Sequence, residues 1–368
     1  MRRIILGIGL TGGHIYPALA LAEELGEKEF EYLFVARTNS PLARRLIEGR
    51  GHPLLALDVA GFPRGAGNLF RRGPDFAWRQ VQALGLCRRA LVDWEPHLAV
   101  GFGGYVSFPL LAAAKWQGIF TLLFEPNAQL GLANKVLSPF ADRTALALGE
   151  FSQTGRAVLV APPLRAGLKA VKSLKAGEAR ERLGLAGAGP CLLIFGGSQG
   201  ALAVNAAARP AISRLKKSGF VFSFIHVAGF RDFRECRDFY QREGLLDGAG
   251  LCLEYLEDMG SAYRASDLVV SRAGAMTCLE LLEFRRRCLL IPLARSTEAH
   301  QWANARCLEQ LGIAKILEEG LGLDARLDAA IKEELANPRR DEVAGTAAPR
   351  PTLAAVAQSL ISGKLRAD

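Results

Sequence analysis

The sequence contains no pattern typical of a metal-dependent enzyme. It has no D-x-D, no H-E-x-x-H and no Walker loop, and its five histidines are too dispersed for a metal site. Seven cysteines are scattered without a C-x-x-C pair, which argues against zinc and is typical of a reducing cytoplasm. We therefore expect chemistry without a protein-held metal ion and without a resident cofactor.

Long uncharged apolar runs are also missing. No stretch of about 20 residues is free of charge or helix breakers, so we expect no membrane-spanning segment. Arg2 and Arg3 before an apolar run imitate a secretory signal, but the run is short and breaks at Thr11–His14, so we reject a signal peptide. The net charge of +9 indicates an anionic partner, and with no nucleic-acid-binding motif we expect no nucleic acid.

The chain is long enough for two α/β domains. It has 368 residues, half of them hydrophobic, which is too many for one ordinary core. Short apolar strands alternate with helix-length segments, and this alternation predicts parallel sheets with helices on both faces. The strands expected in the first half are Arg3–Ile8, Tyr32–Ala36, Leu54–Leu57, His97–Val100, Phe120–Phe124, Thr144–Leu148 and Ala157–Val160.

The pattern restarts after Ala161-Pro162-Pro163, the expected hinge. The strands expected in the second half are Cys191–Phe195, Val221–Val227, Leu251–Tyr255, Leu268–Val270, Cys288–Ile291 and Ala314–Leu317. Residues 338–349 read as a connector, and an apolar stripe predicts a last helix after them. We therefore predict one domain of residues 1–161 with 350–368 and a second of residues 162–337.

A glycine loop follows the first strand of each half and precedes a helix. Gly7–Gly12 matches the dinucleotide fingerprint G-x-G-x-x-G. The next strand runs into Arg37 where an NAD site would have an acidic residue, which suits the extra phosphate of NADP. An NADP-dependent oxidoreductase is therefore an alternative at this point. The second loop, Gly196–Gly200, would have no explanation in such an enzyme.

The most informative stretch runs from Asp267 to Asn304. A short strand turns through a glycine into a helix, and a second strand leads into a polar loop. These turns lie at the carboxyl edge of a parallel sheet, where ligands bind. The helix N-terminus favours a phosphate, and a carboxylate one turn further in, Glu280, is placed to bind a ribose diol. Thr277 and Glu280 also form a capping-box pattern, which alone would explain the glutamate.

The order of residues in this stretch resembles a known family. Ser-Arg-Ala-Gly-Ala-x-Thr-x-x-Glu, a strand ending in Pro292 and then His-Gln-x-x-Asn are similar to the nucleotide-sugar half of GT-B glycosyltransferases. The similarity is greatest to the family of N-acetylglucosaminyltransferases that make lipid II for peptidoglycan, the MurG family. Gly196–Ala201 matches the second glycine loop of that family, and Thr11–His14 matches most of the first, where Leu10 replaces a glycine.

The resemblance implies a GT-B fold with two Rossmann-like domains facing a cleft and a last helix that returns to the first domain. It implies an inverting, metal-independent hexosyltransferase that moves GlcNAc from UDP-GlcNAc to the 4-hydroxyl of MurNAc-pentapeptide on undecaprenyl-diphosphate, converting lipid I to lipid II. The implied partners are UDP-GlcNAc, lipid I and the anionic inner membrane, with the protein peripheral on its cytoplasmic face. A UDP-GlcNAc epimerase of the same fold and a non-enzymatic nucleotide-sugar binder are the alternatives.

The resemblance also implies the binding residues. The implied donor site comprises Thr11, Gly12, Gly13, Asn127, Arg165, Ser198, Leu256, Ala275, Met276, Thr277, Glu280, His300, Gln301 and Asn304. The implied acceptor-diphosphate site comprises Gly12, Gly13, Gly103, Gly104, Tyr105 and Asn134. Within the first set, Glu280 is expected to bind the uridine ribose, and Gln301 with His300 and Asn304 is expected to bind the sugar hydroxyls. Phe124 and Pro126 depart from the family's His-Glu-Gln-Asn segment.

Two residues are candidates for the base that deprotonates the acceptor hydroxyl. His14 lies at the start of a helix, whose positive end disfavours imidazolium and leaves a neutral ring able to accept a proton near pH 7. A helix cap or a phosphate donor is the alternative role for this histidine. Glu125 is the competing candidate for the base.

The segment Phe62–Leu91 mixes large apolar residues with arginines, a combination that suits a membrane interface. The predicted membrane patch comprises Leu69, Phe70, Arg71, Arg72, Trp78, Arg79 and Trp116. The alternative is an ordinary loop and helix whose aromatic side chains lie in the core.

Overall fold

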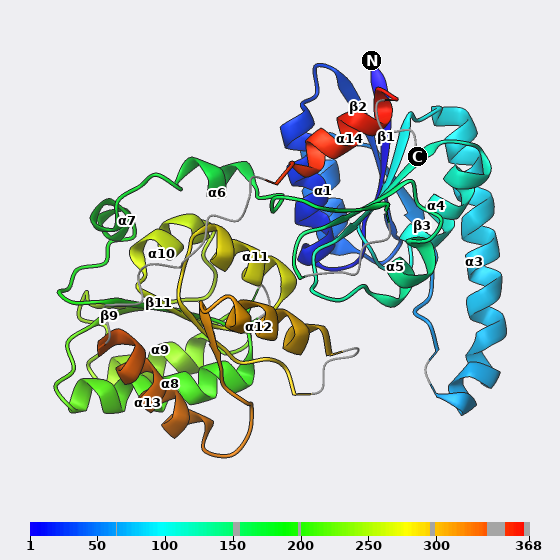
Figure 1. Cartoon of the computed structure of the whole chain (residues 1–368). Helices are drawn as coiled ribbons and strands as arrows, with labels where there is room; N and C mark the ends of the chain where they lie inside the picture. Colours follow the sequence, from blue (N-terminus) through cyan, green and yellow to red (C-terminus); the bar gives the residue numbers. More distant parts are fainter. Residues whose placement is uncertain (64, 150–154, 198–199, 295–298, 337–349, 364–368) are drawn as a thin grey trace. The chain divides into compact units, whose positions relative to one another are not determined.

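The computed structural model describes residues 1–63, 65–149, 155–197, 200–294, 299–336 and 350–363, apart from the side chains of residues 66 and 69. The chain forms two compact units, Met1–Arg165 with Ala347–Asp368 and Ala166–Thr346. Each unit is a parallel sheet with helices on both faces (Figure 1). Within the described residues, no helix combines the length and hydrophobicity that a membrane span requires.

Among the described residues, the sheet of the first unit has seven strands. They are β1 (Arg2–Gly7), β2 (Phe30–Arg37), β3 (Leu54–Leu57), β4 (Leu98–Gly101), β5 (Phe120–Glu125), β6 (Arg143–Leu146) and β7 (Ala157–Leu159), in the order β3-β2-β1-β4-β5-β6-β7. All neighbours pair in parallel. The central strands are almost wholly apolar because helices cover both of their faces.

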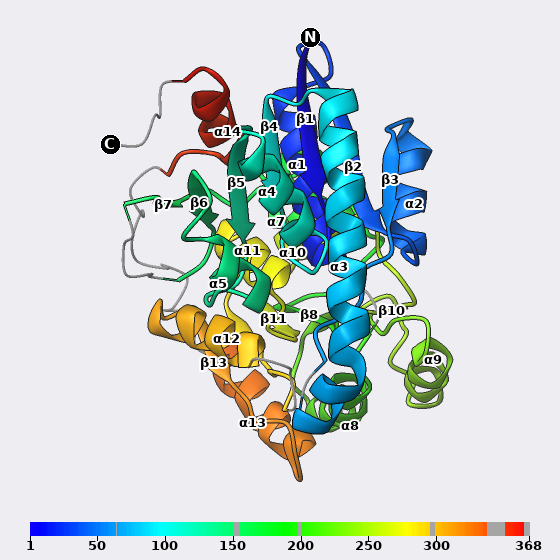
Figure 2. The same cartoon turned by 90° about the vertical axis from the view of Figure 1, so that its right-hand side faces the viewer.

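The helices of the first unit place its loops at the sheet edge. They are α1 (Gly12–Leu25), α2 (Pro41–Ile47), the 3-10 turn η1 (Glu48–Arg50), α3 (Ala66–Trp94), α4 (Ser107–Trp116), α5 (Leu132–Leu137) and α14 (Leu353–Ile361). Helix α14 packs against α1, β4 and β5. Helix α3 buries Ala83, Cys87 and Leu91, which recur every four residues and so face one side. Its N-terminal half extends past the rest of its own unit (Figures 1 and 2).

The second unit repeats the arrangement. Its strands are β8 (Cys191–Phe195), β9 (Ser223–Val227), β10 (Gly250–Leu253), β11 (Leu268–Ser271), β12 (Cys288–Leu290) and β13 (Ala314–Ile316), in the order β10-β9-β8-β11-β12-β13. Its helices are α6 (Ala166–Ala170), α7 (Ala176–Arg182), α8 (Leu202–Lys217), α9 (Phe233–Arg242), α10 (Met259–Ala265), α11 (Ala275–Glu283), α12 (His300–Gln310) and α13 (Leu323–Ala336).

The two sheets have the same topology around their first strands. In each, the first strand lies between the second and the fourth of its unit, so β1 in one corresponds to β8 in the other. A glycine loop follows each of these strands and enters α1 or α8. The prediction of two similar Rossmann-like halves is therefore confirmed. The carboxyl ends of β1, β4, β8 and β11 are where the candidate site residues begin.

Candidate functional site

In the second unit, Glu280 projects from α11 next to the turn that leaves β11. Helix α11 begins at Ala275, and its N-cap is Gly274, which has no side chain to cap with. Thr277 is therefore inside the helix, and the capping-box explanation of Glu280 was wrong. The Tyr263 hydroxyl on α10 donates to Glu280 Oε2 at 2.7 Å, which fixes the carboxylate at the helix surface. The predicted donor residues Ala275 and Met276 are half-buried in the first turn of the same helix.

His300, Gln301 and Asn304 are in the first turns of helix α12, where the sequence predicted a polar loop. Gln301 Oε1 accepts from the backbone N–H of Leu293 at 2.9 Å. Asn304 is fully buried, and its Nδ2 donates to the carbonyl of Ala273 at 3.1 Å. Asn304 thus ties α12 to the turn after β11 from behind the site, whereas Gln301 lies on the site surface.

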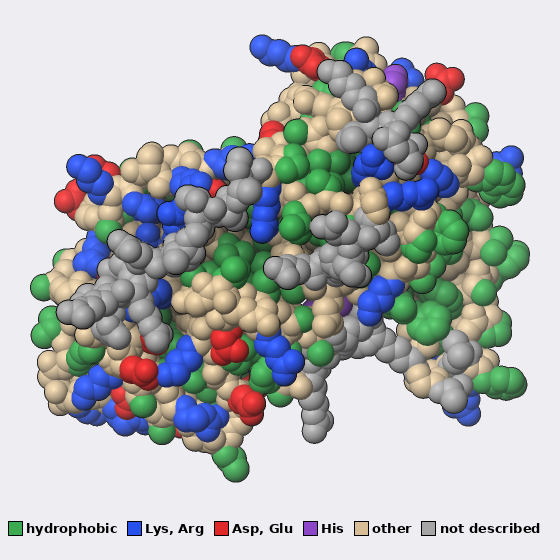
Figure 3. Space-filling model, in the orientation of Figure 1, with side chains coloured by type: hydrophobic (Ala, Val, Ile, Leu, Met, Phe, Trp, Pro, Cys, Tyr) green, Lys and Arg blue, Asp and Glu red, His purple; other side chains and the backbone are tan. Residues whose placement is uncertain are grey.

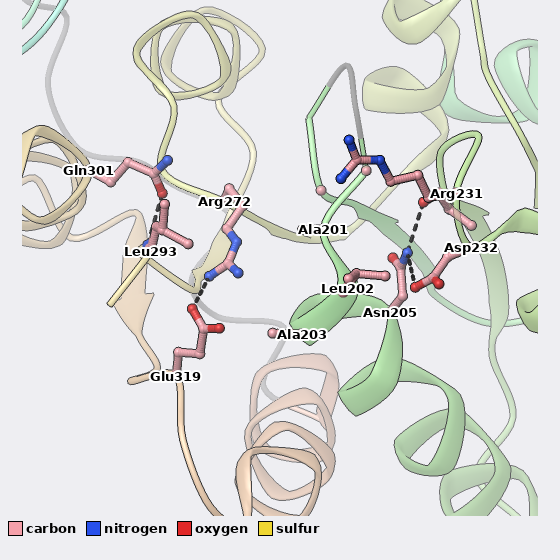
Figure 4. A pocket seen from close by; sticks show the side chains of 13 residues that line it. Ala201, Leu202, Ala203, Asn205, Arg231, Asp232, Arg272, Leu293, Gln301 and Glu319 are labelled. Atoms are coloured by element: carbon pink, nitrogen blue, oxygen red, sulfur yellow. Dashed lines mark hydrogen bonds and ion pairs between the residues drawn. The ribbon is translucent and has the colours of Figure 1, made fainter. Parts of the chain in front are cut away.

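A cavity of about 440 Å³ opens beside Gln301 (Figure 4). One side is formed by the second glycine loop and the start of α8, and the other by Arg272, Leu293, Gln301 and Glu319. The N-cap of α8 is Ala201, whose side chain has no atom that could accept a hydrogen bond from the first N–H groups of the helix. Such a helix N-terminus suits a diphosphate. Ser198, predicted for this site, lies outside the described residues.

A buried polar network supports the α8 side of the cavity. His226 on β9 is fully buried between Asn205 Oδ1, 3.0 Å from its Nε2, and the Tyr240 hydroxyl, 2.8 Å from its Nδ1. Asn205 Nδ2 in turn donates to Asp232 at 3.0 Å. Burial lowers the pKa of His226 to about 3, so this histidine is a neutral structural residue at physiological pH.

In the first unit, His14 lies where the two glycine segments of that unit meet. Its Nδ1 is 3.1 Å from the Thr11 hydroxyl, and a Cβ on Gly103 would lie 3.2 Å from its Nε2. Part of the ring surface stays accessible although protein atoms surround it. Burial lowers the pKa of His14 to about 4, so the ring is neutral at pH 7. The tautomer with a protonated Nδ1 leaves Nε2 able to accept a proton.

The segment after β4 requires its glycines. Gly103 and Gly104 have φ of 90° and 76°, a region that side chains rarely adopt. A Cβ on Gly104 would also lie 3.3 Å from the Cα of Gly9. The two glycine segments therefore touch, and they bring Gly12, Gly13 and His14 beside the start of α4. Tyr105 follows them and packs edge-on against Phe76 of α3 at 6.3 Å.

Glu125 anchors the loop that follows β5. Its buried carboxylate accepts four hydrogen bonds, from the backbone N–H and Nδ2 of Asn127, the N–H of Gly131 and Nδ2 of Asn134, at 2.8–3.1 Å. Asn134 Nδ2 also donates to the Phe124 carbonyl, so its donor group is engaged, and its buried Oδ1 has no partner among the described residues. This geometry indicates that Glu125 positions the loop after β5. It leaves Asn134 Oδ1 as the atom that can accept a further hydrogen bond.

Two further residues predicted for the donor site, Arg165 and Leu256, lie as follows in the structure. The Arg165 guanidinium lies over the ring of Tyr16 on α1, 4.4 Å from its centroid, so in this conformation it packs on the first unit. Leu256 follows β10 and is half-buried, next to the exposed Tyr255, whose ring stacks on that of Phe230.

The predicted membrane patch is exposed on α3. Phe70, Trp78 and Val81 are 88%, 62% and 60% exposed, and at about 100° per residue they share one side of the helix. Hydrophobic side chains protrude over α3 in Figure 3. Trp116, at the end of α4, is also exposed and borders an apolar cavity of about 370 Å³ between α4 and α5. The side chain of Leu69 lies outside the described residues.

The arginines of the patch differ in whether a neighbouring carboxylate neutralises their charge. Arg71 and Arg72 are exposed. Arg79 donates to both oxygens of Asp75 at 2.9–3.0 Å and to Asp58 at 2.6 Å, so its charge is already compensated. The sequence placed Arg79 in a basic patch from its residue type alone. Asp75 and Asp58 neutralise its charge, so Arg79 does not add positive charge to the patch.

Comparison with known proteins defines the class. The profile of the glycosyltransferase family 28 N-terminal domain matches residues 4–146, and that of the C-terminal domain matches residues 191–359. The crystal structure of MurG from Acinetobacter baumannii superposes with a TM-score of 0.72 at 25% identity and covers 99% of this chain and 98% of its own. The fold and both matches define a two-domain GT-B glycosyltransferase.

Full-length relatives narrow the class. The UDP-N-acetylglucosamine--N-acetylmuramyl-(pentapeptide) pyrophosphoryl-undecaprenol N-acetylglucosamine transferase of Halothermothrix orenii is 34% identical over 354 residues, 92% of either chain. The protein of the same name from Phocaeicola vulgatus is 33% identical and covers 90% of this chain and 87% of its own. The chain therefore belongs to this family of N-acetylglucosamine transferases within glycosyltransferase family 28. The G-x-G-x-x-G pattern at Gly7–Gly12 is accordingly a glycosyltransferase loop and not that of an NADP enzyme.

Some site residues gave no signal in the sequence. Tyr263, Arg272 and Glu319 contact predicted site residues or line the cavity, yet none stands in a recognisable pattern of its own. Arg272 was visible only as part of the Ser-Arg-Ala-Gly string, and Glu319 lies 47 residues further along the chain.

Proposed function

We propose that this protein transfers GlcNAc from UDP-GlcNAc to the 4-hydroxyl of the muramoyl sugar of lipid I, forming lipid II for peptidoglycan. The observation that carries the proposal is the 34% identity to the Halothermothrix orenii transferase across 92% of both chains. Similarity at that level over the full length covers both the unit that we assign to the donor and the unit that we assign to the acceptor.

The second unit binds the donor in this proposal. Glu280, held by Tyr263, accepts from the ribose hydroxyls, and the N-terminus of α8 receives the diphosphate. Gln301 has its amide oxygen on Leu293, so its NH2 group is the part that donates to the sugar hydroxyls. Backbone beside Leu256 reads the uracil.

The first unit binds the acceptor and supplies the base. The touching glycine segments around Gly12 and Gly103 present backbone N–H groups to the diphosphate of lipid I. His14 removes the proton of the attacking hydroxyl, which its neutral ring permits at pH 7. One in-line displacement inverts the anomeric centre, and helix N-termini stabilise the charge of the departing UDP.

Docking on the cytoplasmic face of the inner membrane completes the proposal, because the undecaprenyl chain stays in the bilayer. Phe70, Trp78 and Trp116 are exposed apolar side chains that suit the headgroup layer. Arg71 and Arg72 are exposed, follow Phe70 directly in the sequence and would meet anionic lipid. The protein is thus a peripheral membrane enzyme in this proposal.

The donor half is tested by Glu280→Ala. We expect UDP to bind roughly 10- to 150-fold more weakly, because a hydrogen bond to a charged group contributes about 1.5–3 kcal/mol. Titration calorimetry with UDP measures the change. Tyr263→Phe is the matched variant, which loses only the hydroxyl that orients Glu280, and we expect a smaller loss. NADP is the control nucleotide and should bind neither variant nor wild type. Equal UDP affinity in folded Glu280→Ala would refute this ribose contact.

A further inference from the structure

Arg272 and Glu319 form an ion pair at the carboxyl edge of the second sheet. Arg272 follows β11 directly and is only 9% exposed. Its Nη1 donates to Glu319 Oε2 at 2.7 Å and to the carbonyl of Ile291 at 3.1 Å, with that of Pro292 at 3.4 Å. One guanidinium thus holds the chain just beyond β12 as well as a carboxylate that follows β13.

Glu319 holds the same turn from the other side. Its Oε2 accepts from the backbone N–H of Ala294 at 3.4 Å as well as from Arg272. The backbone from Ile291 to Ala294 is therefore attached at two carbonyls and one N–H to a single ion pair. The hydrogen bond from Arg272 lowers the pKa of Glu319, so the pair stays charged at neutral and mildly acidic pH.

The same turn orients Gln301. The N–H of Leu293, inside the held segment, donates to Gln301 Oε1 at 2.9 Å. Figure 4 shows Arg272 facing Glu319 and Gln301 beside Leu293, on the side of the cavity opposite Asn205 and Asp232. A shift of the turn would therefore move the acceptor that fixes the Gln301 amide.

Glu280 takes its position from a different contact. Tyr263 on α10 orients its carboxylate, and α11 carries it. The ribose and sugar ends of the proposed donor site are thus held by separate groups, so a perturbation of the ion pair should affect one end and spare the other.

We infer that the Arg272–Glu319 pair positions the sugar-binding end of the donor site, so that it sets affinity for the GlcNAc part of the donor and not for the uridine part. The inference rests on the proposed function, because it names the groups that orient Gln301 for the sugar. Arg272 and Glu319 are positioning residues here, since they act through Gln301.

The test compares two ligands on the same full-length variant. Glu319→Ala is expected to weaken UDP-GlcNAc binding about five- to tenfold, the loss of roughly one well-placed hydrogen bond. UDP itself should bind within about twofold of wild type. Calorimetry gives both dissociation constants. The ratio of the constant for UDP-GlcNAc to the constant for UDP is expected to rise, and general destabilisation of the unit would not change this ratio. Glu319→Gln keeps an acceptor for Arg272 and should restore most of the ratio.

Glu318→Ala is the matched control. It removes the adjacent, exposed carboxylate, which is not among the residues that line this cavity, and should leave both affinities unchanged. Equal weakening of UDP and UDP-GlcNAc by Glu319→Ala, or no weakening of either, would overturn the inference. If Glu319→Ala does not fold, Glu319→Leu, which fills the same space without an acceptor for Arg272, decides: an elevated ratio supports the inference and a wild-type ratio overturns it. A wild-type protein that binds no UDP-GlcNAc instead overturns the proposed function.

Discussion

His14→Ala is expected to lower kcat by about 10²- to 10⁴-fold, the usual contribution of a positioned general base. The dissociation constant for UDP-GlcNAc should stay within about twofold of wild type, because proton removal matters in the transition state and little in the ground state. Steady-state kinetics with lipid I and donor titration on the same protein preparation separate the two effects. Thermal unfolding checks that the variant is folded.

The pH profile gives a second measure of the same residue. A base acts in its unprotonated form, and burial lowers the pKa of His14 from about 6.5 to about 4. Protonation of His14 therefore removes activity only as the pH falls through about 4, and kcat/KM should show no step from this residue near pH 6.5. A histidine with an ordinary pKa would lose half its activity there.

Glu125→Gln distinguishes the two candidate bases. The carboxylate already accepts four hydrogen bonds from the loop after β5, so the amide would place its own NH2 against N–H donors. We expect both lower thermal stability and lower turnover from this variant. A Glu125→Gln protein with wild-type stability and no turnover, beside a nearly active His14→Ala, would move the base to Glu125.

Reversing Arg71 and Arg72 to Glu together is expected to abolish binding to anionic vesicles. Each basic residue near such a surface contributes about 1 kcal/mol, so changing the pair from +2 to −2 removes about 4 kcal/mol, on the order of 10³-fold in affinity. Vesicle co-sedimentation with phosphatidylglycerol measures the change, and UDP binding should be unaffected. Arg79 is left in place because Asp58 and Asp75 already neutralise it, and its reversal would put three carboxylates together.

The matched control for this reversal is Arg44→Glu with Arg45→Glu. These adjacent arginines of α2 are exposed and give the same change in net charge on a different helix. Vesicle binding should survive in the control if the α3 surface docks on the membrane. Equal loss in both pairs would mean that only net charge matters, and retained binding after reversal of Arg71 and Arg72 would exclude α3 as the docking surface.

The strands were predictable because they are short apolar runs that helices cover on both faces. Leu54–Leu57 and Cys191–Phe195 were predicted to the residue, and the repeated glycine loops indicated two halves with the same topology. Contiguous motifs also indicated most of the candidate site, since a motif of neighbouring residues survives in sequence as a string.

Contacts between distant residues could not be predicted in the same way. The pairing of Arg272 with Glu319 and the four hydrogen bonds on Glu125 depend on where separate loops meet in space. The capping box failed because Thr277 and Glu280 have the right spacing but the helix begins before them. The long helix α3 was missed in its full extent because Gly73 and Pro74 in its first turns predict a break.

The central claim is the transfer of GlcNAc from UDP-GlcNAc to lipid I. Wild-type protein is incubated with UDP-[¹⁴C]GlcNAc and lipid I in detergent, and label in the extracted lipid is counted against a reaction without lipid I. The account predicts label in a lipid that runs as the disaccharide product, with UDP released in equal amount. Label that stays in the nucleotide pool, or a converted nucleotide sugar formed without lipid I as an epimerase would give, would contradict it.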